Sequence, residues 1–534
     1  MCKNDADRAG RVARQVLCAL AIASTAAGAQ TSGQTAFVFR MGTDTIGIER
    51  FSASTGGVSG EVLMRGQPRI TYLATREAAG RIGELYIVAY PAGSGPDASA
   101  LQSVRLRVVA DTGIAEITAG GSTQTQRLPS KVDAFPLLNS SFGMIEVALE
   151  RMSGANRDSV TFPVLLASGG QTLSATARRV SADSVIVTIG PSQSHLALRG
   201  ASILRAHVPV QRLVVERVEG DAVRRLALGK PDYSAPAGAP YRAEHVRIPT
   251  PAGHVLAGTL TIPQGTRGRR LPVVITISGS GPQDRDESLP IVPGFRPFRQ
   301  IADTLGRRGI AVLRLDDRGT GESTGDFAKS SSADFADDVR AAIAWLRARP
   351  DVNPARIALL GHSEGAMIAP MVAATDSRLA GIVLMAGPSK RGREVLDHQI
   401  RYGIEHDSSI APAKRDSAFA ASRIAADTTA APPPWMKFFL AYEPLPTIRK
   451  VKVPVLVLQG ATDQQVTADQ AEAIGAALRQ AGNRDVTVRV LPNRNHLFLP
   501  DSIGNPAGYV RLPSGKIGPD VMGEIAGWLV PRLR

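Results

Sequence analysis

Residues 356–374 read RIALLGHSEGAMIAPMVAA and decide the fold. The apolar run at 357–360 leads directly into Gly-His-Ser-Glu-Gly at 361–365, and an apolar, helix-like run follows from 366 to 374. A strand, a sharp turn and a helix in this order lift a serine hydroxyl above the edge of a parallel sheet. The flanking glycines permit the close backbone approach that such a turn needs. The stretch therefore predicts an α/β domain with Ser363 as its nucleophile.

A second segment fits the same G-x-S-x-G pattern, which is a weak signal by itself because the chain has 52 glycines in 534 residues. Residues 321–325 read Gly-Glu-Ser-Thr-Gly, but the stretch that follows, 326–332, is polar and does not have the pattern of a helix. Without the strand–turn–helix arrangement, the hydroxyl is not presented at a sheet edge. We therefore expect Ser323 to have a structural role.

A serine hydroxyl is a weak nucleophile at neutral pH and needs a base within hydrogen-bonding reach. In folds with this strand–turn–helix, the serine comes first in the chain, the acid second and the histidine last. Of the 8 histidines, three follow the nucleophile: His398, His406 and His496. The first two fall in an irregular stretch, whereas the third lies in a loop after the alternating run 486–491. His496 is therefore the predicted base.

The acid is expected after a late strand. Residues 453–458 read Val-Pro-Val-Leu-Val-Leu, and Asp463 lies in the loop that leaves this apolar run. Catalytic groups collect at the carboxyl edge of parallel sheets. A carboxylate there holds the histidine in the required tautomer and stabilises the imidazolium formed during turnover. Asp316 and Asp317 are alternatives, but they precede the nucleophile in the sequence, so Asp463 is the predicted acid.

An oxyanion that develops on the substrate carbonyl needs backbone N–H donors. One donor is expected from Glu364, the residue after the nucleophile, at the start of a helix whose dipole adds to its effect. The other is expected from the loop at 278–282, Ser-Gly-Ser-Gly-Pro, which follows the strand-like run 273–277. We favour the N–H of Ser280, with Gly281 as its neighbour, over a plain turn at this point.

Beyond residue 243, short apolar runs alternate with helix-like segments. Alternation of this kind favours a mainly parallel sheet that is covered on both faces. It breaks down between 389 and 450, a stretch too long for a plain connection. We interpret this stretch as a cap over the site, and a static surface excursion is the alternative. The clearest expected helices cover 298–308, 335–348, 366–374 and 468–480.

The region from 35 to 218 mostly alternates apolar and polar residues with a period of two, as at 104–108, 145–149 and 185–189. Such alternation places one face of each strand on a core and the other in water. It predicts an antiparallel all-β domain, either a sandwich or an open barrel. We identify no chemistry in its sequence.

These patterns divide the chain. The β domain is expected over residues 30–230, and residues 231–242, which are rich in Pro, Ala and Gly, are interpreted as a linker. The catalytic α/β domain is expected over 243–534, with its cap at about 389–450.

The first 29 residues have the features of a signal peptide. Basic residues between positions 3 and 14 precede an apolar stretch from 16 to about 27, and Ala-Gly-Ala at 27–29 forms a small-x-small cleavage signal. The apolar stretch is well short of the ~20 residues that span a bilayer. We therefore predict cleavage after Ala29 and export to the periplasm or the extracellular space, without stable membrane insertion.

The formal net charge is +14, but Lys and Arg are scattered and no basic run is interleaved with aromatic residues. This distribution indicates a solvated basic surface and argues against nucleic-acid binding. The only two cysteines, Cys2 and Cys18, fall in the predicted signal peptide. The mature chain would then lack a thiol, which excludes a cysteine nucleophile, a disulfide and a cysteine metal ligand.

Three further segments, together with residues 361–365, form a set of motifs. Residues 278–286 read Ser-Gly-Ser-Gly-Pro-Gln-Asp-Arg-Asp, 317–323 read Asp-Arg-Gly-Thr-Gly-Glu-Ser, and 251–254 read Pro-Ala-Gly-His. Together with 361–365, they resemble the α/β-hydrolase superfamily, in the bacterial branch of serine-aminopeptidase-like esterases, over a little more than half of the chain. In that branch a histidine commonly leads the first segment, where this chain has Ser278. Relatives with a β-rich domain ahead of the hydrolase domain are mostly secreted carboxylesterases, which the resemblance implies here.

The residues and the resemblance together favour hydrolysis of a small-molecule carboxylic ester through an acyl-enzyme, with no metal and no organic cofactor. A peptidase or aminopeptidase with the same triad is the first alternative, with Glu405 or Glu443 as an anchor for the substrate amine. A non-catalytic protein that binds a glycan or a lipid through the β domain is the second. Four aromatic residues either line an acyl pocket or pack inside the cap: Trp435, Phe438, Phe439 and Tyr442.

Overall fold

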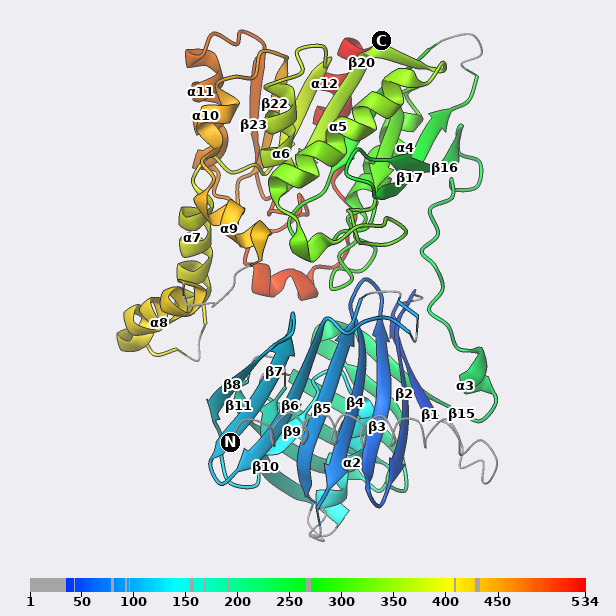
Figure 1. Cartoon of the computed structure of the whole chain (residues 1–534), viewed down its shortest axis with the longest axis vertical. Coiled ribbons are helices and arrows are strands. Elements are labelled where there is room, and N and C mark those ends of the chain that lie inside the picture. The colour runs from blue at the N-terminus through cyan, green and yellow to red at the C-terminus, as the bar shows by residue number, and fades with distance from the viewer. Residues whose placement is uncertain are drawn as a thin grey trace, which may run out of the picture.

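The computed structural model describes two units that follow each other along the chain, a β-rich one and an α/β one (Figure 1). The predicted signal peptide, residues 1–29 with both cysteines, lies outside the described residues. Among the described residues, no helix combines the length and the apolar character needed to cross a membrane. The described residues are 35–42, 44–77, 81–91, 94–95, 97–153, 158–167, 170–190, 192–265, 270–407, 410–427 and 433–534.

The first unit is built on one sheet, which has fifteen strands in the described part of the chain. Their order is β8-β7-β6-β5-β4-β3-β2-β1-β15-β14-β13-β12-β11-β10-β9. Neighbouring strands run antiparallel, except for β9 and β10, which are parallel. The strands are β1 (Thr35–Met41), β2 (Asp44–Ser54), β3 (Gly57–Met64), β4 (Arg69–Arg76), β5 (Ile82–Tyr90), β6 (Gln102–Val109), β7 (Thr112–Ala119), β8 (Ser122–Pro129), β9 (Phe135–Leu137), β10 (Ser159–Leu166), β11 (Thr172–Ser181), β12 (Ser184–Ile189), β13 (Ser192–Arg199), β14 (Ser202–Val208) and β15 (Leu213–Glu219).

This sheet curves around one apolar face. Buried residues alternate along its strands, as in β12, where Val185 and Val187 are buried. Because only one face of each strand is apolar, the sheet closes over that face. The Thr172 hydroxyl of β11 donates to the Pro129 carbonyl of β8 at 3.0 Å, so the two ends of the sheet come together. The described strands of this unit form one curved sheet, as expected for the open barrel, and not the two sheets of a sandwich.

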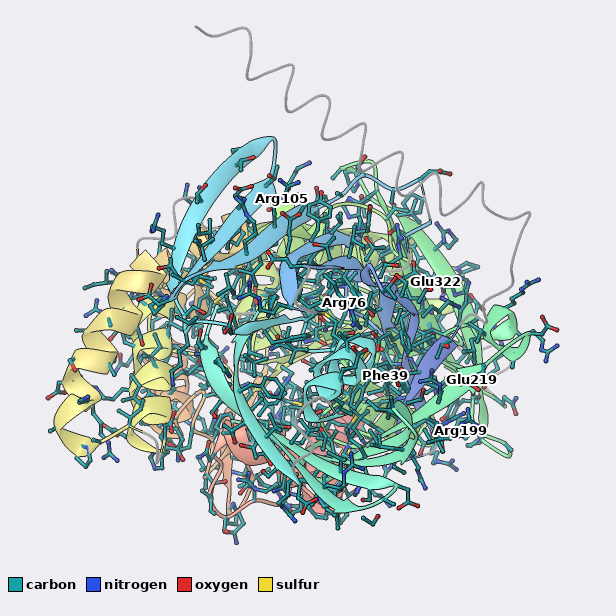
Figure 2. All side chains as sticks on the ribbon, turned by 90° about the horizontal axis from the view of Figure 1, so that it is seen from below. Phe39, Arg76, Arg105, Arg199, Glu219 and Glu322 are labelled. Carbon is teal, nitrogen blue, oxygen red and sulfur yellow. The ribbon has the colours of Figure 1, made fainter. Side chains whose placement is uncertain are left out.

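The curve encloses helix α2 (Phe142–Ser153), where the alternation at 145–149 wrongly predicts a strand. Buried residues lie on nearly all sides of the helix, so its sequence lacks the one-sided period that marks a surface helix. The N–H groups of Phe142 and Gly143 donate to the buried Glu49 carboxylate of β2, at 2.7 and 3.2 Å. Figure 2 shows α2 inside the curve, with Phe39 beside it. Short elements complete the unit and its exit: η1 (Pro209–Gln211) and α3 (Ala222–Arg225).

The second unit contains a sheet of eight strands in the order β16-β17-β19-β18-β20-β21-β22-β23, counted over the described residues. Strand β17 pairs antiparallel with both of its neighbours, and the six strands from β19 to β23 are parallel. Strands β18, β21 and β22 are buried throughout, as expected for a parallel sheet covered on both faces. The strands are β16 (Tyr241–Pro249), β17 (Val255–Pro263), β18 (Leu271–Ile277), β19 (Ala311–Leu315), β20 (Val352–His362), β21 (Gly381–Met385), β22 (Val455–Gly460) and β23 (Val486–Leu491).

Helices cover both faces of this sheet. Four of them, α5, α6, α10 and α11, share one hydrophobic core with the sheet, and α4 and α12 share the other. This architecture confirms the predicted α/β-hydrolase fold. The helices are α4 (Pro297–Gly306), α5 (Ser332–Ala348), α6 (Glu364–Ala373), α10 (Pro444–Ile448), α11 (Asp469–Gln480) and α12 (Pro519–Leu533), with the short turns η2 (Phe327–Lys329) and η4 (Pro506–Arg511).

The insertion between β21 and β22 contains the stretch for which a cap is predicted. Figure 1 shows its helices α7 and α8 projecting from one side of the α/β unit, with α9 closer to the sheet. Val395 of α7 and Trp435 of α9 line a pocket that also contains Ser363. Besides α10, the cap elements are α7 (Gly392–Glu405), η3 (Pro412–Lys414), α8 (Arg415–Asp427) and α9 (Pro434–Ala441).

A few polar contacts join the two units. The Arg212 guanidinium, just after η1, donates to the carbonyls of Arg511 and Pro513 at 3.4 Å each. Asp44 of β2 and Arg296, just before α4, form an ion pair at 3.7 Å. These contacts place the rim of the curved sheet against the loops that surround the carboxyl ends of the parallel strands.

Candidate active site

Ser363 lies on a strained turn between a strand and a helix. Strand β20 ends at His362, α6 begins at Glu364, and Ser363 between them has φ 54° and ψ −115°. A residue with a side chain pays an energetic cost for a positive φ, and such strain clusters at functional sites. The turn presents the half-buried hydroxyl at the carboxyl edge of the sheet.

Two glycines make this turn possible. A Cβ atom on Gly361 would lie 2.1 Å from the Gly365 carbonyl oxygen, and one on Gly365 would lie 2.0 Å from the Ile277 carbonyl oxygen. Neither separation is compatible with any side chain, because both obstructing atoms belong to the backbone. The close packing of β20, α6 and β18 therefore requires glycine on each side of the serine.

The predicted base and acid are hydrogen-bonded to each other. His496 Nδ1 lies 2.8 Å from Asp463 Oδ2, and both residues are buried. The other Asp463 oxygen, Oδ1, accepts from the N–H groups of Gln465 and Val466 at 2.8 and 2.9 Å. A carboxylate fixed in this way holds the proton of the imidazole on Nδ1 and leaves Nε2 free to accept one.

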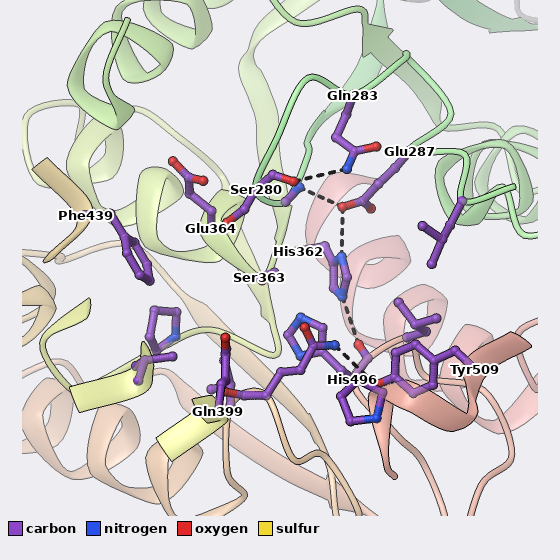
Figure 3. Close-up of a pocket in the computed structure, with 18 of the residues that line it drawn as sticks. Ser280, Gln283, Glu287, His362, Ser363, Glu364, Gln399, Phe439, His496 and Tyr509 are labelled. Atoms are coloured by element: carbon purple, nitrogen blue, oxygen red, sulfur yellow. Dashed lines mark hydrogen bonds and ion pairs between the residues drawn. The ribbon is translucent and has the colours of Figure 1, made fainter. Parts of the chain in front are cut away.

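A pocket of about 400 Å³ brings the predicted residues together (Figure 3). Ser363, His496, Ser280 and Glu364 all line it, and Asp463 lies behind the histidine. Most of the remaining wall is apolar. Residues of this kind are Leu289, Ile291, Phe295, Val395, Leu396, Trp435, Met436, Phe439, Val466 and Leu497.

The buried carboxyl group of Asp317 anchors the loop after β18. The Ser278 hydroxyl donates to Asp317 Oδ1 at 2.7 Å, and the Gln283 N–H donates to Asp317 Oδ2 at 2.9 Å. Burial raises the pKa of Asp317 well above its usual value, against the effect of these hydrogen bonds. Ser278 therefore anchors the loop through Asp317.

Within this loop the N–H groups have different roles. The Gly279 N–H donates to Glu287 Oε1 at 2.6 Å and is therefore occupied. The Ser280 carbonyl accepts from the Gln283 side chain at 3.2 Å, which fixes the orientation of the Ser280–Gly281 peptide. The Gly279 N–H is therefore not available to an oxyanion, and Ser280 remains the predicted donor from this loop.

Glu364 links the turn to the cap. Its buried carboxyl group accepts from the Trp435 indole N–H of α9, at 2.8 Å to each oxygen, and from the Ser332 hydroxyl at 2.6 Å. Burial raises the pKa of Glu364, and the hydrogen bonds from Ser332, Trp435 and Ser280 oppose that effect. The Trp435 ring stacks on Phe439 with 5.5 Å between the ring centroids, so both aromatic residues form one wall of the pocket.

The other residues considered from the sequence lie elsewhere. Phe438 stacks on Tyr442, whose hydroxyl donates to Thr447 at 2.7 Å, and neither aromatic residue is part of the pocket lining. Glu405 is exposed at the end of α7, and Glu443 pairs with Arg391, so neither reaches the pocket as an amine anchor.

Two site residues are missed by the motif analysis. His362 and Glu287 line the pocket and are hydrogen-bonded at 2.9 Å, yet the sequence shows them only as a variable position of G-x-S-x-G and as the residue after Asp-Arg-Asp. Their pairing across 75 positions is a signal that a single sequence does not contain.

Comparison with known proteins places this site in a wider context. Residues 296–507, which include the serine, the acid and the histidine, match the model of the Prolyl oligopeptidase family. Esterase EstD of Thermotoga maritima is 29% identical over 284 residues, which are 52% of this chain and 65% of EstD. Dipeptidyl aminopeptidase BIII of Pseudoxanthomonas mexicana is 26% identical over 266 residues, which are 47% of this chain and 35% of that protein. The chain thus spans less than two thirds of the length of either relative.

Among solved structures, the esterase Pf2001 of Pyrococcus furiosus aligns with 57% of this chain and 95% of its own, at 17% identity and a TM-score of 0.40. The fold described above defines the class: the second unit is an α/β-hydrolase domain. Over about half of its length the chain is similar to both an esterase and a peptidase.

Proposed function

We propose that this protein is a serine hydrolase that cleaves carboxylic esters through a covalent acyl-enzyme. One observation carries the proposal: a serine on a strained strand-to-helix turn shares a pocket with a histidine whose Nδ1 is hydrogen-bonded to a buried carboxylate. This combination of a raised hydroxyl, an oriented base and a fixed acid matches the requirements of nucleophilic acyl transfer.

In this mechanism the Ser363 hydroxyl attacks the ester carbonyl carbon and His496 Nε2 takes its proton. Asp463 stabilises the imidazolium that results. The backbone N–H groups of Glu364 and Ser280 bind the oxyanion, and the removal of one such donor typically costs about 10²–10³ in rate. His496 then protonates the leaving alkoxide, and water, activated by the same imidazole, hydrolyses the acyl-enzyme. These steps need no metal and no organic cofactor.

The composition of the pocket supports an ester with an uncharged, apolar acyl group. The lining contains the ten apolar side chains given above, together with Pro388 and Pro506, and no lysine or arginine among its described residues. Both glutamates in the wall, Glu287 and Glu364, are engaged by other side chains. An aminopeptidase would need an accessible, free carboxylate to bind the substrate amine. Glu364 is engaged by Trp435 and Ser332, and the unpaired Oε2 of Glu287 is buried.

We further propose that the protein is exported, on the strength of the basic, apolar and small-residue pattern of residues 1–29. Amino-terminal sequencing of protein from the periplasm or the culture medium would then begin at Gln30.

The function is tested by comparing aryl esters of graded acyl length with aminoacyl anilides, together with labelling by a fluorophosphonate probe. We expect ester turnover with little anilide cleavage, and labelling of the full chain that is absent in Ser363→Ala. Preferential cleavage of anilides would favour the peptidase. A folded chain that neither labels nor hydrolyses any ester would favour a binding protein.

A further inference from the structure

A second histidine–carboxylate pair lies directly behind the nucleophile. His362 Nδ1 is 2.9 Å from Glu287 Oε1, and His362 Nε2 is 2.9 Å from the backbone carbonyl oxygen of His496. His362 is 6% exposed and Glu287 is 5% exposed. Figure 3 shows the resulting line of contacts, from the loop after β18 through Glu287 and His362 to His496.

The partners of His362 determine its protonation state. A carbonyl oxygen only accepts hydrogen bonds, so Nε2 must carry a proton to bond the His496 carbonyl. Glu287 Oε1 already accepts the Gly279 N–H. A carboxylate only accepts hydrogen bonds, so Nδ1 carries a proton as well in the ion pair with Glu287. Burial favours the neutral imidazole, but the charge and hydrogen bond of Glu287, with the His496 carbonyl and Asp463, outweigh it and raise the pKa of His362.

The pair connects two parts of the site that must be aligned for catalysis. Through Glu287 it holds the Gly279 peptide, next to the proposed oxyanion donor Ser280. Through His362 it holds the main chain of His496, the proposed base. Oxyanion donors and a general base must be held within about 0.5 Å of the productive geometry for efficient catalysis.

The conformation and surroundings of Glu287 in the Glu287–His362 pair are energetically unfavourable. Glu287 has a φ of 53°, which is unfavourable for a residue with a side chain. Its second oxygen, Oε2, is buried without a hydrogen-bond partner in the described residues. Strain and an unpaired buried oxygen are typical of residues retained for function.

We propose, building on the proposed function, that Glu287 and His362 are positioning residues that lock the oxyanion loop to the loop of the catalytic histidine, with the doubly protonated His362 as the active form. Loss of a proton from His362 breaks one of its two hydrogen bonds, and the two loops are then no longer held together through this pair. Asp463 after β22 acts on His362, and Asp317 after β19 acts on Glu287. Three further titratable groups line the same pocket: His496 after β23, Glu364 at the start of α6 and Tyr509 in η4.

The kinetic test uses Glu287→Gln in the full chain. Glutamine keeps the size and an oxygen that accepts the Gly279 N–H, but it removes the charge that keeps His362 protonated. We expect kcat to fall at least tenfold with KM changed less than threefold, and the alkaline limb of the kcat/KM profile to move to lower pH by one unit or more. His362→Gln retains a side-chain N–H for the His496 carbonyl and should lose that alkaline limb.

A matched control pair lies outside the site. His254 Nε2 and Asp338 Oδ1 are also buried and 2.8 Å apart, but neither residue lines the pocket that contains Ser363. Asp338→Asn should lower the free energy of unfolding without moving the alkaline limb. If Glu287→Gln behaved like this control, with kcat within twofold of wild type and an unmoved limb, the positioning role would be wrong.

Nitrogen-15 NMR of histidine-labelled protein measures the protonation of the two His362 ring nitrogens and does not depend on turnover. We expect both ring nitrogens of His362 to be protonated at pH 7.5 in the wild type and one to be unprotonated in Glu287→Gln. A neutral His362 in the folded wild type would overturn the proposal. A charged His362 in a chain that fails to hydrolyse esters would instead identify the proposed function as the part that failed.

Discussion

The chain contains two segments with the same pattern of residue types, Gly361–Gly365 and Gly321–Gly325, and their serines have opposite surroundings. Ser363 ends a strand, has a positive φ and lines the pocket. The buried Ser323 hydroxyl donates to the Asp316 carbonyl and accepts from the Ala257 N–H, both at 2.8 Å. A hydroxyl that both donates and accepts a backbone hydrogen bond stabilises a turn and is not available as a nucleophile.

The glycines of the two segments also have different roles. Gly361 and Gly365 have no positive φ; they are required because neighbouring backbone lies about 2 Å from where a Cβ would be. Gly321 and Gly325 have φ of 57° and 105° and are required by their own backbone conformation. Close approach of a strand, a turn and a helix therefore distinguishes the proposed nucleophile from the serine of a loop with the same sequence pattern.

The largest expected effect is the loss of turnover when Ser363, but not Ser323, is replaced by alanine. Ser363→Ala should lower kcat for esters by about 10⁴–10⁶-fold, because the nucleophile is lost and only the binding and oxyanion contributions remain. Steady-state kinetics on an aryl ester, with circular dichroism to verify the fold, measures it.

Ser323→Ala is the matched control. It leaves the Ala257 N–H without its acceptor, so the free energy of unfolding should fall by about 1–3 kcal/mol while kcat per folded molecule stays within twofold of wild type. An inactive but fully folded Ser323→Ala would break the comparison.

The next effect concerns the glycines. In Gly365→Ala the new Cβ would meet the Ile277 carbonyl at 2.0 Å, and the residue after Ile277 begins the oxyanion loop. We expect a loss of about 2–3 kcal/mol or more in unfolding free energy and, in the molecules that fold, a fall in kcat of about 10²-fold from the displaced loop.

Gly325→Ala provides the contrast. Its nearest atoms would be at 3.3 Å, which small shifts relieve, so the cost arises mainly from φ and should be about 1–3 kcal/mol. Because Gly325 does not line the pocket, kcat per folded molecule should be unchanged. Chemical denaturation and kinetics on the same preparations separate the two effects, and equal losses of kcat would contradict the distinction.

Much of the fold follows from the sequence because local patterns encode it. The apolar run, glycines and following helix around Ser363 are contiguous, and α4, α5, α6 and α11 begin and end within a few residues of the segments expected for them. The assignments of Asp463 and His496 rest on chain order, and the structure brings these two side chains to 2.8 Å.

What the sequence does not reveal depends on contacts between distant residues. Helix α2 is buried inside the curved sheet, so its apolar residues show no single face and resemble a strand. The Glu287–His362 pair and the Trp435–Glu364 hydrogen bond each join segments more than 70 positions apart. Such pairs arise only when the fold is complete, and no local period predicts them.

A smaller effect is expected from the cap contact at the position after the nucleophile. Trp435→Phe keeps an aromatic wall but removes the indole N–H from the buried Glu364. The free energy of unfolding should fall by about 1–3 kcal/mol, and the preference among acyl chain lengths should weaken because α9 is held less firmly over the pocket. The control is Phe438→Leu, since this ring packs on Tyr442 outside the pocket lining and should not alter acyl preference.

The smallest expected effect is on the pH dependence of stability. It distinguishes Glu364 of the first segment from Glu322 of the second. Burial raises the pKa of Glu364 above 4.5, so the folded chain binds its proton more tightly and the contribution of Glu364 to stability is lost as pH rises from 4.5 through the raised value. The Lys230 ammonium, with Arg285, lowers the pKa of Glu322, so its contribution is present above pH 4.5 and is lost as pH falls through the lowered value.

Replacement by glutamine should therefore give opposite pH trends. As pH rises above 4.5, Glu364→Gln gains stability relative to the wild type, because the variant has no charge to bury. Glu322→Gln loses at most about 1 kcal/mol at pH 7, because water screens a partly exposed ion pair, and this deficit vanishes in acid. Urea denaturation at intervals between pH 3 and 8 measures both curves. Parallel curves would mean that the two glutamates have the same environment in solution, and the contrast between the two segments would fail at this position.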